Sequence, residues 1–313
     1  DRIKNFLNPT IKNNLPNPTS IKDMDIATNS ATTHIQEKNI VGIFADYDVD
    51  GATSAALLAK YFKKINRPYK LFIPDRIKHG YGPNIEGFNF LINEGSKLII
   101  TVDCGTSSHE AISYAKNKNI ETIILDHHQG DIKLPEATAI VNPNRIDDES
   151  NLNYLCAAGV CFMFLIGLNK KLRDKNWFKL NNIDEPEILN FLDLVSLGTI
   201  CDVVPVIKLN RAIVKQGLKI FRKRKNIGLK TLYDSSEIKS TPNTYHLGYL
   251  IGPKINAGGR VGKSSLGAEL LISDNQEKVD YLSKKLNYYN DQRKKIEFKL
   301  IKIAENKIKN IND

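Results

Sequence analysis

Short apolar runs alternate with helix-like segments through the first half of the chain. The runs lie at residues 40–44, 69–73, 98–102, 122–125 and 139–141, and each has the length of a buried strand bounded by polar turns. Segments of helical spacing separate the first four runs, at residues 52–65, 84–93 and 107–116, with Ser107 as a predicted cap. This alternation predicts parallel βαβ units, so we expect an α/β fold with a mostly parallel sheet flanked by helices.

The second half has little strand signal and is expected to be a helical segment that completes the same domain. Helices are predicted at residues 157–169, 185–197 and 210–224. Beyond them, a seven-residue repeat interrupted only by Arg293 predicts one long helix. The repeat positions are Val279, Leu282, Leu286, Tyr289, Ile296, Leu300 and Ile303. We therefore divide the chain into a domain over residues 1–272 and a long connecting helix over residues 273–313. We expect this helix to pack along its own domain or to lead to another domain, rather than to form a dimeric coiled coil.

Composition predicts a soluble globular protein with a basic surface. The 313 residues are 41% hydrophobic, which is enough for a sizeable core. The net charge of +10 suits a polyanionic partner, although AT-rich codon usage explains it equally well. No apolar run has the length of a membrane span or the context of a signal peptide, so we expect a cytoplasmic protein with no membrane partner. The spacing of the four cysteines favours neither disulfides nor a zinc site.

Acidic and imidazole groups follow three of the predicted strands. These groups are Asp46, Asp48 and Asp50, then Asp103, then Asp126, His127 and His128. In an open parallel sheet, ligands bind beyond the carboxyl ends of the strands, so the groups should converge there. A single aspartate is as readily a helix cap or turn former, but several crowded acids repel one another unless cations lie among them. Carboxylate and imidazole ligands suit Mn²⁺ or Mg²⁺, and two such ions can clamp a phosphodiester during in-line attack.

Four motifs resemble, in order and spacing, those of the DHH phosphoesterase superfamily. They are Asp46-Tyr47-Asp48-Val49-Asp50-Gly51, Thr101-Val102-Asp103-Cys104-Gly105, Asp126-His127-His128 and Gly198-Thr199-Ile200-Cys201-Asp202-Val203. Further segments are similar to the RecJ branch of this superfamily. They are Pro74-Asp75-Arg76, Gly80-Tyr81-Gly82, Cys156-Ala157-Ala158-Gly159-Val160 and Gly252-Pro253-Lys254-Ile255-Asn256-Ala257-Gly258-Gly259-Arg260. The resemblance covers essentially the whole chain and implies that residues 1–272 are a DHH catalytic domain.

The resemblance also implies a role for each motif residue. Asp48 and Asp103 would hold one divalent ion, Mn²⁺ or Mg²⁺, and the second ion would be held by Asp50, Asp103, His127 and Asp202, with Asp103 as the bridge. The other implied catalytic residues are His128, which would face the phosphate and stabilise developing charge or assist the leaving group, and Asp46, which would be an additional ligand or orient the attacking water. The implied contacts to substrate phosphates are Arg76, Tyr81, Asn256 and Arg260.

Two departures from the family pattern are visible. Many members have a ligating histidine at the position of Phe44, so we expect a weaker first metal site rather than a loss of activity. Full-length relatives continue into a DHHA1 domain and an OB-fold, and too few residues follow Ile303 for either. We therefore expect the chain to be a fragment of such a protein.

Taken with the motifs, the resemblance implies a nuclease that hydrolyses single-stranded DNA from the 5′ end in DNA repair and recombination. Single-stranded DNA is the expected partner, and a single-strand-binding protein or a helicase is a candidate protein partner. Two alternatives stay open. One is a DHH phosphodiesterase acting on short oligonucleotides or small nucleotides, against which Arg76 and Gly80-Tyr81-Gly82 argue. The other is a non-catalytic replication scaffold, against which the retained metal-ligand residues argue.

Overall fold

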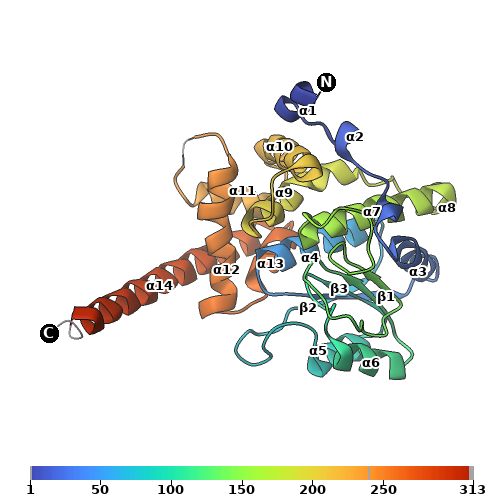
Figure 1. The fold of residues 1–313 in the computed structure, drawn as a ribbon, viewed down its shortest axis with the longest axis horizontal. Coiled ribbons are helices and arrows are strands. Elements are labelled where there is room, and N and C mark those ends of the chain that lie inside the picture. The colour runs from blue at the N-terminus through green and yellow to red at the C-terminus, as the bar shows by residue number, and fades with distance from the viewer. Residues whose placement is uncertain (1, 239, 310–313) are drawn as a thin grey trace.

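A parallel sheet of five strands forms the centre of the molecule in the computed structural model, which describes residues 2–238 and 240–309 (Figure 1). The strands are β1 (Ile40–Ala45), β2 (Tyr69–Phe72), β3 (Ser96–Val102), β4 (Glu121–Leu125) and β5 (Ala139–Val141). They pair in the order β2-β1-β3-β4-β5, and every pairing is parallel. All five predicted strands are confirmed with small shifts at their ends. Because the chain moves outward from β1 in one direction to β2 and in the other to β3, the carboxyl ends of β1 and β3 border the crevice where open α/β sheets bind ligands.

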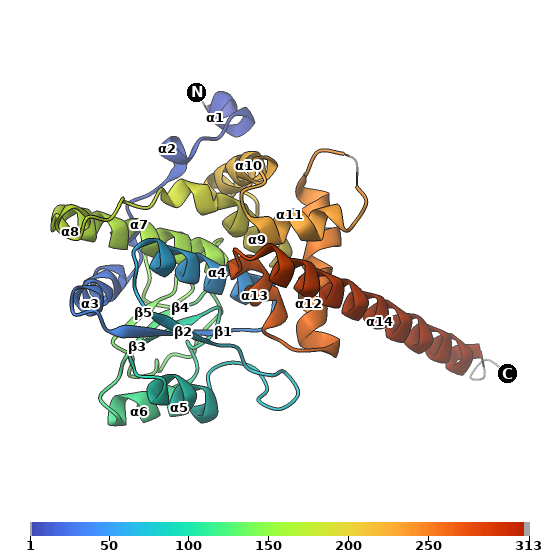
Figure 2. The ribbon, with the colours of Figure 1, turned by 180° about the vertical axis from the view of Figure 1, so that it is seen from behind.

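Helices cover both faces of this sheet, as the alternating sequence predicts (Figures 1 and 2). One face carries α5 (Ile85–Asn93) and α6 (His109–Asn117), and the other carries α3 (Met24–Gln36), α4 (Val49–Lys64) and α7 (Ala157–Asp174). Four of the strands are buried nearly throughout, from Val41 to Ala45 in β1 for example, because helices exclude water from both sides, whereas the edge strand β2 is half-buried. The predicted cap at Ser107 is wrong, since α6 starts one residue later with Ser108 at its N-cap position and no side-chain capping bond there.

Most of the remaining helices are short, and several of them pack on α4 or α7. These remaining helices are α1 (Arg2–Leu7), α2 (Ile11–Asn14), η1 (Pro18–Ser20), α8 (Trp177–Leu180), η2 (Ile188–Phe191), α9 (Leu192–Cys201), α10 (Lys208–Arg222), α11 (Ile227–Asp234), η3 (His246–Ile251), α12 (Gly252–Val261) and α13 (Leu266–Ile272). The helix predicted at 185–197 is partly wrong, because a 3₁₀ turn at Ile188 follows Pro186 and the α-helix starts only at Leu192. Proline lacks an N–H group and biases the residue before it away from helix, which accounts for the late start.

The long helix predicted near the end of the chain is confirmed as α14 (Gln276–Lys309). Val279, Leu282 and Leu286 are buried against the domain, whereas Leu300 and Ile303 are more than half exposed. The second part of α14 projects away from the rest of the molecule (Figures 1 and 2). The seven-residue repeat is therefore buried only in its first part.

No helix within the described ranges is long and apolar enough to cross a lipid bilayer.

Candidate metal centre

Acidic side chains from distant parts of the sequence converge beyond the ends of β1, β3 and β4. Three groups have their nitrogen and carboxylate oxygen atoms within 4.8 Å of one another. These groups are Asp46 with Asp48 and Asp103, Asp50 with His127 and Asp202, and Asp103 with His127 and His128. The Nε2 atom of His127 lies 3.4 Å from Asp103 Oδ1, 3.5 Å from Asp202 Oδ2 and 3.8 Å from Asp50 Oδ2. The structure thus brings together all the metal-ligand residues that the sequence predicts.

Asp48 serves the local fold as well as this cluster. Its Oδ1 atom accepts hydrogen bonds from the N–H groups of Asp50, at 2.8 Å, and Gly51, at 3.0 Å, so it is the N-cap of α4. The cap fixes the turn by which the chain leaves β1. The helix-cap interpretation is therefore confirmed for Asp48, and the same turn brings Asp46 and Asp50 to the acidic cluster.

Asp50 connects the cluster to the two helices behind it. Its carboxylate accepts the N–H groups of Ala157, at 2.6 Å, and Ala158, at 3.0 Å, which are the first residues of α7. A Cβ atom on Gly198 of α9 would lie 2.5 Å from Asp50 Oδ1, so only glycine allows α9 to approach this closely. Burial, followed by the negative charges of Asp202 and Asp48, raises the pKa of Asp50. The carboxylate therefore holds the start of α7, and α9, which Asp202 follows, packs closely against it.

The two histidines after β4 have opposite electrostatic environments. Burial, together with the charge of His128, lowers the pKa of His127 to about 4. His128 Nδ1 lies 2.8 Å from Asp126 Oδ1, and this hydrogen bond raises the pKa of His128. Although burial alone would raise the pKa of Asp126, its bonds with His128 and Thr106 lower it to about 2. The structure thus favours a neutral His127, which suits a metal ligand, and a cationic His128, which suits a phosphate contact.

A buried amide network that the sequence did not predict positions both histidines. Asn142, directly after β5, donates to Thr106 Oγ1 and to the carbonyl oxygen of His128, each at 2.8 Å. Asn144 donates from its side chain to the carbonyl oxygen of His127. Thr106 donates in turn to Asp126 Oδ2, from its N–H group at 3.0 Å and from Oγ1 at 2.7 Å. The available signal was the position of Asn142 at the carboxyl end of a predicted strand.

Several atoms in the cluster lack hydrogen-bond partners although they are buried. Among the described residues, none bonds to Asp46 Oδ1, Asp103 Oδ1 or His127 Nε2. Burial, followed by the charge of Asp48, raises the pKa of Asp46 to about 7. An unpaired buried polar atom costs about 1–3 kcal/mol, and a charged one more. Divalent cations would remove this penalty, so the donor set fits hard metal ions.

The predicted phosphate-binding residues lie at the rim of the cluster. Arg76 and Arg260 line one cavity of about 720 Å³, and the guanidinium of Arg76 lies 5.4 Å from the ring centroid of Tyr47. The Tyr81 hydroxyl donates to the carbonyl oxygen of Asp103 at 3.2 Å and lies 3.2 Å from His128 Nδ1. The cavity also includes Arg293 of α14, which the sequence offered only as an interruption of a repeat.

Among the predicted phosphate-binding residues, Asn256 has the least direct connection to the acidic cluster. It lies on α12 four positions before Arg260, and its Oδ1 atom is buried without a hydrogen bond to any described residue. No hydrogen bond joins its side chain to the acidic cluster within the described part of the chain.

Phe44 belongs to the core and not to the acidic cluster. Its ring is fully buried and lies 5.5 Å from the ring of Phe72 and 5.7 Å from that of Phe88. The expectation that an apolar residue here weakens the first metal site is not supported, because the side chain packs beneath α5.

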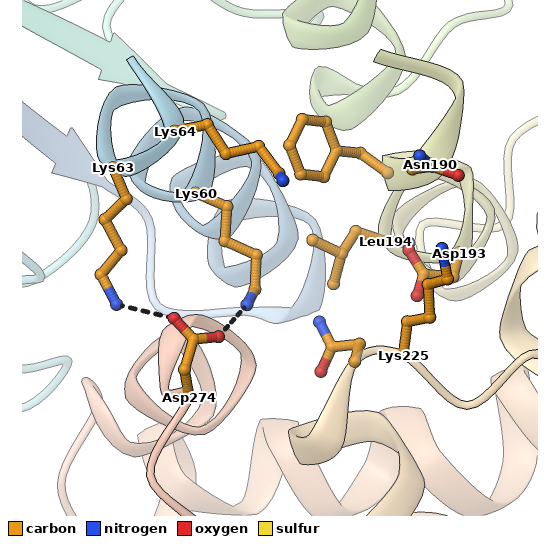
Figure 3. A pocket seen from close by; sticks show the side chains of 10 residues that line it. Lys60, Lys63, Lys64, Asn190, Asp193, Leu194, Lys225 and Asp274 are labelled. Atoms are coloured by element: carbon orange, nitrogen blue, oxygen red, sulfur yellow. Dashed lines mark hydrogen bonds and ion pairs between the residues drawn. The ribbon is translucent and has the colours of Figure 1, made fainter. Parts of the chain in front are cut away.

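A second polar pocket lies at the opposite end of α4. Its volume is about 380 Å³, and its lining includes Lys60, Lys63 and Lys64 from the end of α4 (Figure 3). Asp274 pairs with Lys60 at 3.0 Å and Lys63 at 3.2 Å. Asp193 is buried in the pocket wall. Because α4 runs between the two places, this pocket is separate from the candidate metal centre.

The chain belongs to the DHH family. The model of the family described as "DHH family, N-terminal domain" matches residues 40–199. This range includes β1 to β5 and every residue of the acidic cluster except Asp202. The single-stranded-DNA-specific exonuclease RecJ of Salmonella typhimurium is 37% identical over 282 residues, covering 88% of this chain and 48% of that protein. RecJ of Bacillus subtilis is 31% identical, covering 90% of this chain and 34% of that protein.

Solved structures agree with these relatives. A crystal structure of exonuclease RecJ bound to manganese superposes with a TM-score of 0.80 at 28% identity, covering 90% of this chain and 69% of that one. RecJ of Thermus thermophilus in complex with Mn²⁺ superposes with a TM-score of 0.77 at 26% identity, covering 92% of this chain and 41% of that one. The resemblance to RecJ is confirmed, and the chain spans about half the length of the curated relatives that it matches most extensively.

Proposed function

We propose that this chain is the catalytic part of a metal-dependent nuclease that hydrolyses phosphodiester bonds of single-stranded DNA, from the 5′ end. The observation that carries the proposal is the convergence of Asp46, Asp103 and His127, whose buried atoms lack hydrogen-bond partners among the described residues. The similarity to exonucleases named for single-stranded DNA supplies the substrate class.

Two divalent ions, Mn²⁺ or Mg²⁺, are the proposed cofactors. Asp48 and Asp103, with Asp46 beside them, would hold one ion. The other would be held by Asp50, Asp103, His127 and Asp202. When bound, such ions polarise a phosphoryl oxygen and lower the pKa of a water molecule. Asp103 is the one carboxylate assigned to both ions, and a neutral His127 is ready to ligate without first losing a proton.

The residues around the ions bind and orient the substrate. His128, held by Asp126, which raises its pKa, directs a hydrogen-bond donor at the scissile phosphate or the leaving oxygen. Asp46, with its pKa raised to about 7, is suited to accept a proton from the attacking water. Arg76 and Arg260 hold neighbouring phosphates, and Tyr81 positions the His128 ring.

The decisive experiment incubates the purified chain with end-labelled single-stranded and duplex DNA, with Mn²⁺ or with EDTA. We expect Mn²⁺-dependent release of nucleotides from the 5′ end of the single strand and little attack on the duplex. Faster cleavage of dinucleotides than of long strands would instead indicate a small-nucleotide phosphodiesterase. Absence of both cleavage and metal binding by calorimetry would indicate a non-catalytic scaffold.

A cytoplasmic location, a role in DNA repair and recombination, and a single-strand-binding protein or helicase as partner remain predictions from the sequence. The boundary between a catalytic domain at residues 1–272 and a connecting helix at residues 273–313 is likewise a proposal, supported by the exposure of the second part of α14.

A further inference from the structure

Two exposed tyrosines lie side by side at the start of the π-helix η3, with Tyr245 at its N-cap position and Tyr249 within it. The rings of Tyr245 and Tyr249 are 59% and 72% exposed, and they stack with centroids 5.2 Å apart and an interplanar angle of 24°. Large aromatic side chains are normally buried, so an exposed stacked pair marks a surface that another molecule can cover. The π-helical turn that carries Tyr249 is itself rare and is often found at functional sites.

The tyrosines share one face of a continuous helical segment with residues at the candidate metal centre. η3 runs directly into α12, and the spacing from Tyr245 to Tyr249, Pro253, Asn256 and Arg260 is four, four, three and four residues. Residues three or four positions apart lie on the same side of a helix, so these positions follow one face of the segment. Between these positions lie His246, Leu247, Ile251 and Ile255, which are buried on the other side.

A row of glycines next to this face packs the segment against the catalytic residues. A Cβ atom on Gly248 would lie 3.2 Å from Ile200, and one on Gly252 would lie 2.6 Å from Cys201 Sγ. A Cβ atom on Gly259 would lie 3.2 Å from the carbonyl oxygen of Tyr47. These neighbours belong to the motifs that carry Asp202 and Asp48. The segment therefore packs against residues next to Asp202 and Asp48, and the tyrosines lie at its beginning.

We propose that Tyr245 and Tyr249 form a stacking platform for bases of the substrate strand, at the far end of a track that leads along η3 and α12 to Arg260. The proposal rests on the proposed function and adds a base-binding element to it. Bases of any sequence stack on aromatic rings, so the platform favours unpaired strands without selecting sequence. Tyr249 and Arg260 are eleven residues apart, which is about 16 Å of helix and roughly five nucleotides at stacked spacing.

The test compares the chain with its Y245A/Y249A and Y245F/Y249F variants. Binding to a single strand of roughly twelve nucleotides is measured with Ca²⁺ in place of Mn²⁺ to suppress cleavage. We expect the alanine pair to weaken binding by roughly five- to a hundredfold and the phenylalanine pair to retain it, because stacking needs the ring and not the hydroxyl. Tyr281→Ala, which removes an exposed tyrosine of α14 away from the track, should bind as the unaltered chain does.

A second arm locates the contact on the DNA. Removing the bases at roughly the fourth to sixth nucleotides from the 5′ end should weaken binding by the unaltered chain as much as the alanine pair does. It should weaken the alanine variant no further, because the two changes remove the same contact. If the two losses of binding free energy were fully additive, or if the alanine variant bound as the unaltered chain does, the platform would be wrong. The exposed tyrosines would then be better explained as a contact for a protein partner.

The experiments distinguish a failure of the stacking platform from a failure of the proposed nuclease function. If the unaltered chain cleaves single strands but the alanine pair binds and cleaves them equally well, only the platform is wrong. If the chain cleaves no DNA yet loses base-dependent binding with the alanine pair, the nuclease function is wrong and the platform stands.

Discussion

His128 Nδ1 lies 2.8 Å from the Oδ1 atom of Asp126, and this contact helps to give the adjacent imidazoles of His127 and His128 opposite pKa shifts. Asp126 raises the pKa of His128, whereas burial and the charge of His128 lower that of His127 to about 4. The pKa of one ring is thereby raised and that of its neighbour lowered.

Asp126→Asn should lower the pKa of His128 in the metal-free protein, because the amide keeps a hydrogen bond but removes the negative charge. The pKa of His127 should change less, because this ring loses the lowering effect of the His128 charge and the raising effect of Asp126 together. NMR titration of the imidazole resonances measures both values in one sample. An unaltered pKa of His128 would contradict the assignment of Asp126 as its electrostatic partner.

Asp103→Asn should abolish hydrolysis, by roughly a thousandfold or more, and lower the number of bound Mn²⁺ ions. Asparagine is preferred over alanine because residue 103 has a φ of 62°, a conformation that asparagine tolerates. The same variant should stabilise the metal-free fold by about 1–3 kcal/mol, since burial and neighbouring acids raise the pKa of Asp103. Calorimetric metal titration and thermal unfolding in EDTA test both expectations. Near-normal turnover by the folded variant would exclude the bridging role.

Asp193 provides a pH-dependent stability test away from the metal centre. Burial raises its pKa to about 6 from the ordinary value of 3.8. The folded state therefore binds the proton more tightly than the unfolded chain, and the stability present below pH 3.8 is lost as the pH rises through 6. Asp193→Asn should raise the free energy of unfolding by ~3 kcal/mol at pH 7 and by much less at pH 4. Asp131→Asn at an exposed site is the control, and an equal effect at both pH values would refute the linkage.

Arg76→Ala and Arg260→Ala should each weaken binding to single-stranded DNA and reduce the slope of log affinity against log salt by about 0.7. Metal content should not change, because a guanidinium does not ligate cations. Lys118→Ala, which removes a charge between α6 and β4, at the opposite end of the strands from the acidic cluster, should leave the slope at its original value. Either arginine whose removal leaves both affinity and slope unaltered is not a phosphate contact.

Phe44→His should destabilise the protein by about 3 kcal/mol without improving Mn²⁺ affinity. The imidazole would replace a ring that stacks on Phe72 and meets Phe88 edge to face. Urea unfolding and metal titration of the same preparation separate the two effects. A clear gain in Mn²⁺ affinity would show that residue 44 can reach the site.

The sequence predicted best what depends on local pattern and on the topology of parallel sheets. The strands and the convergence of Asp46, Asp103 and His127 follow from apolar runs that each end in an acid. Contacts between distant segments were out of reach. Nothing local in Asn142 indicates that it holds the carbonyl oxygen of His128. Likewise, the seven-residue repeat of α14 has the same appearance where Leu286 is buried and where Leu300 is exposed, because burial depends on what lies opposite the helix.

The two hydrogen bonds that Asp50 accepts from the first N–H groups of α7 have a consequence for relatives that no longer catalyse. Such a protein could lose its metals and still need this carboxylate to keep α7 and α9 in place. Persistence of an aspartate at this position is therefore weak evidence of activity in an uncharacterised homologue. Asp103 Oδ1 and His127 Nε2 make no structural hydrogen bond to the described residues. Replacement of Asp103 or His127 is therefore the better sign that a homologue has lost catalytic activity.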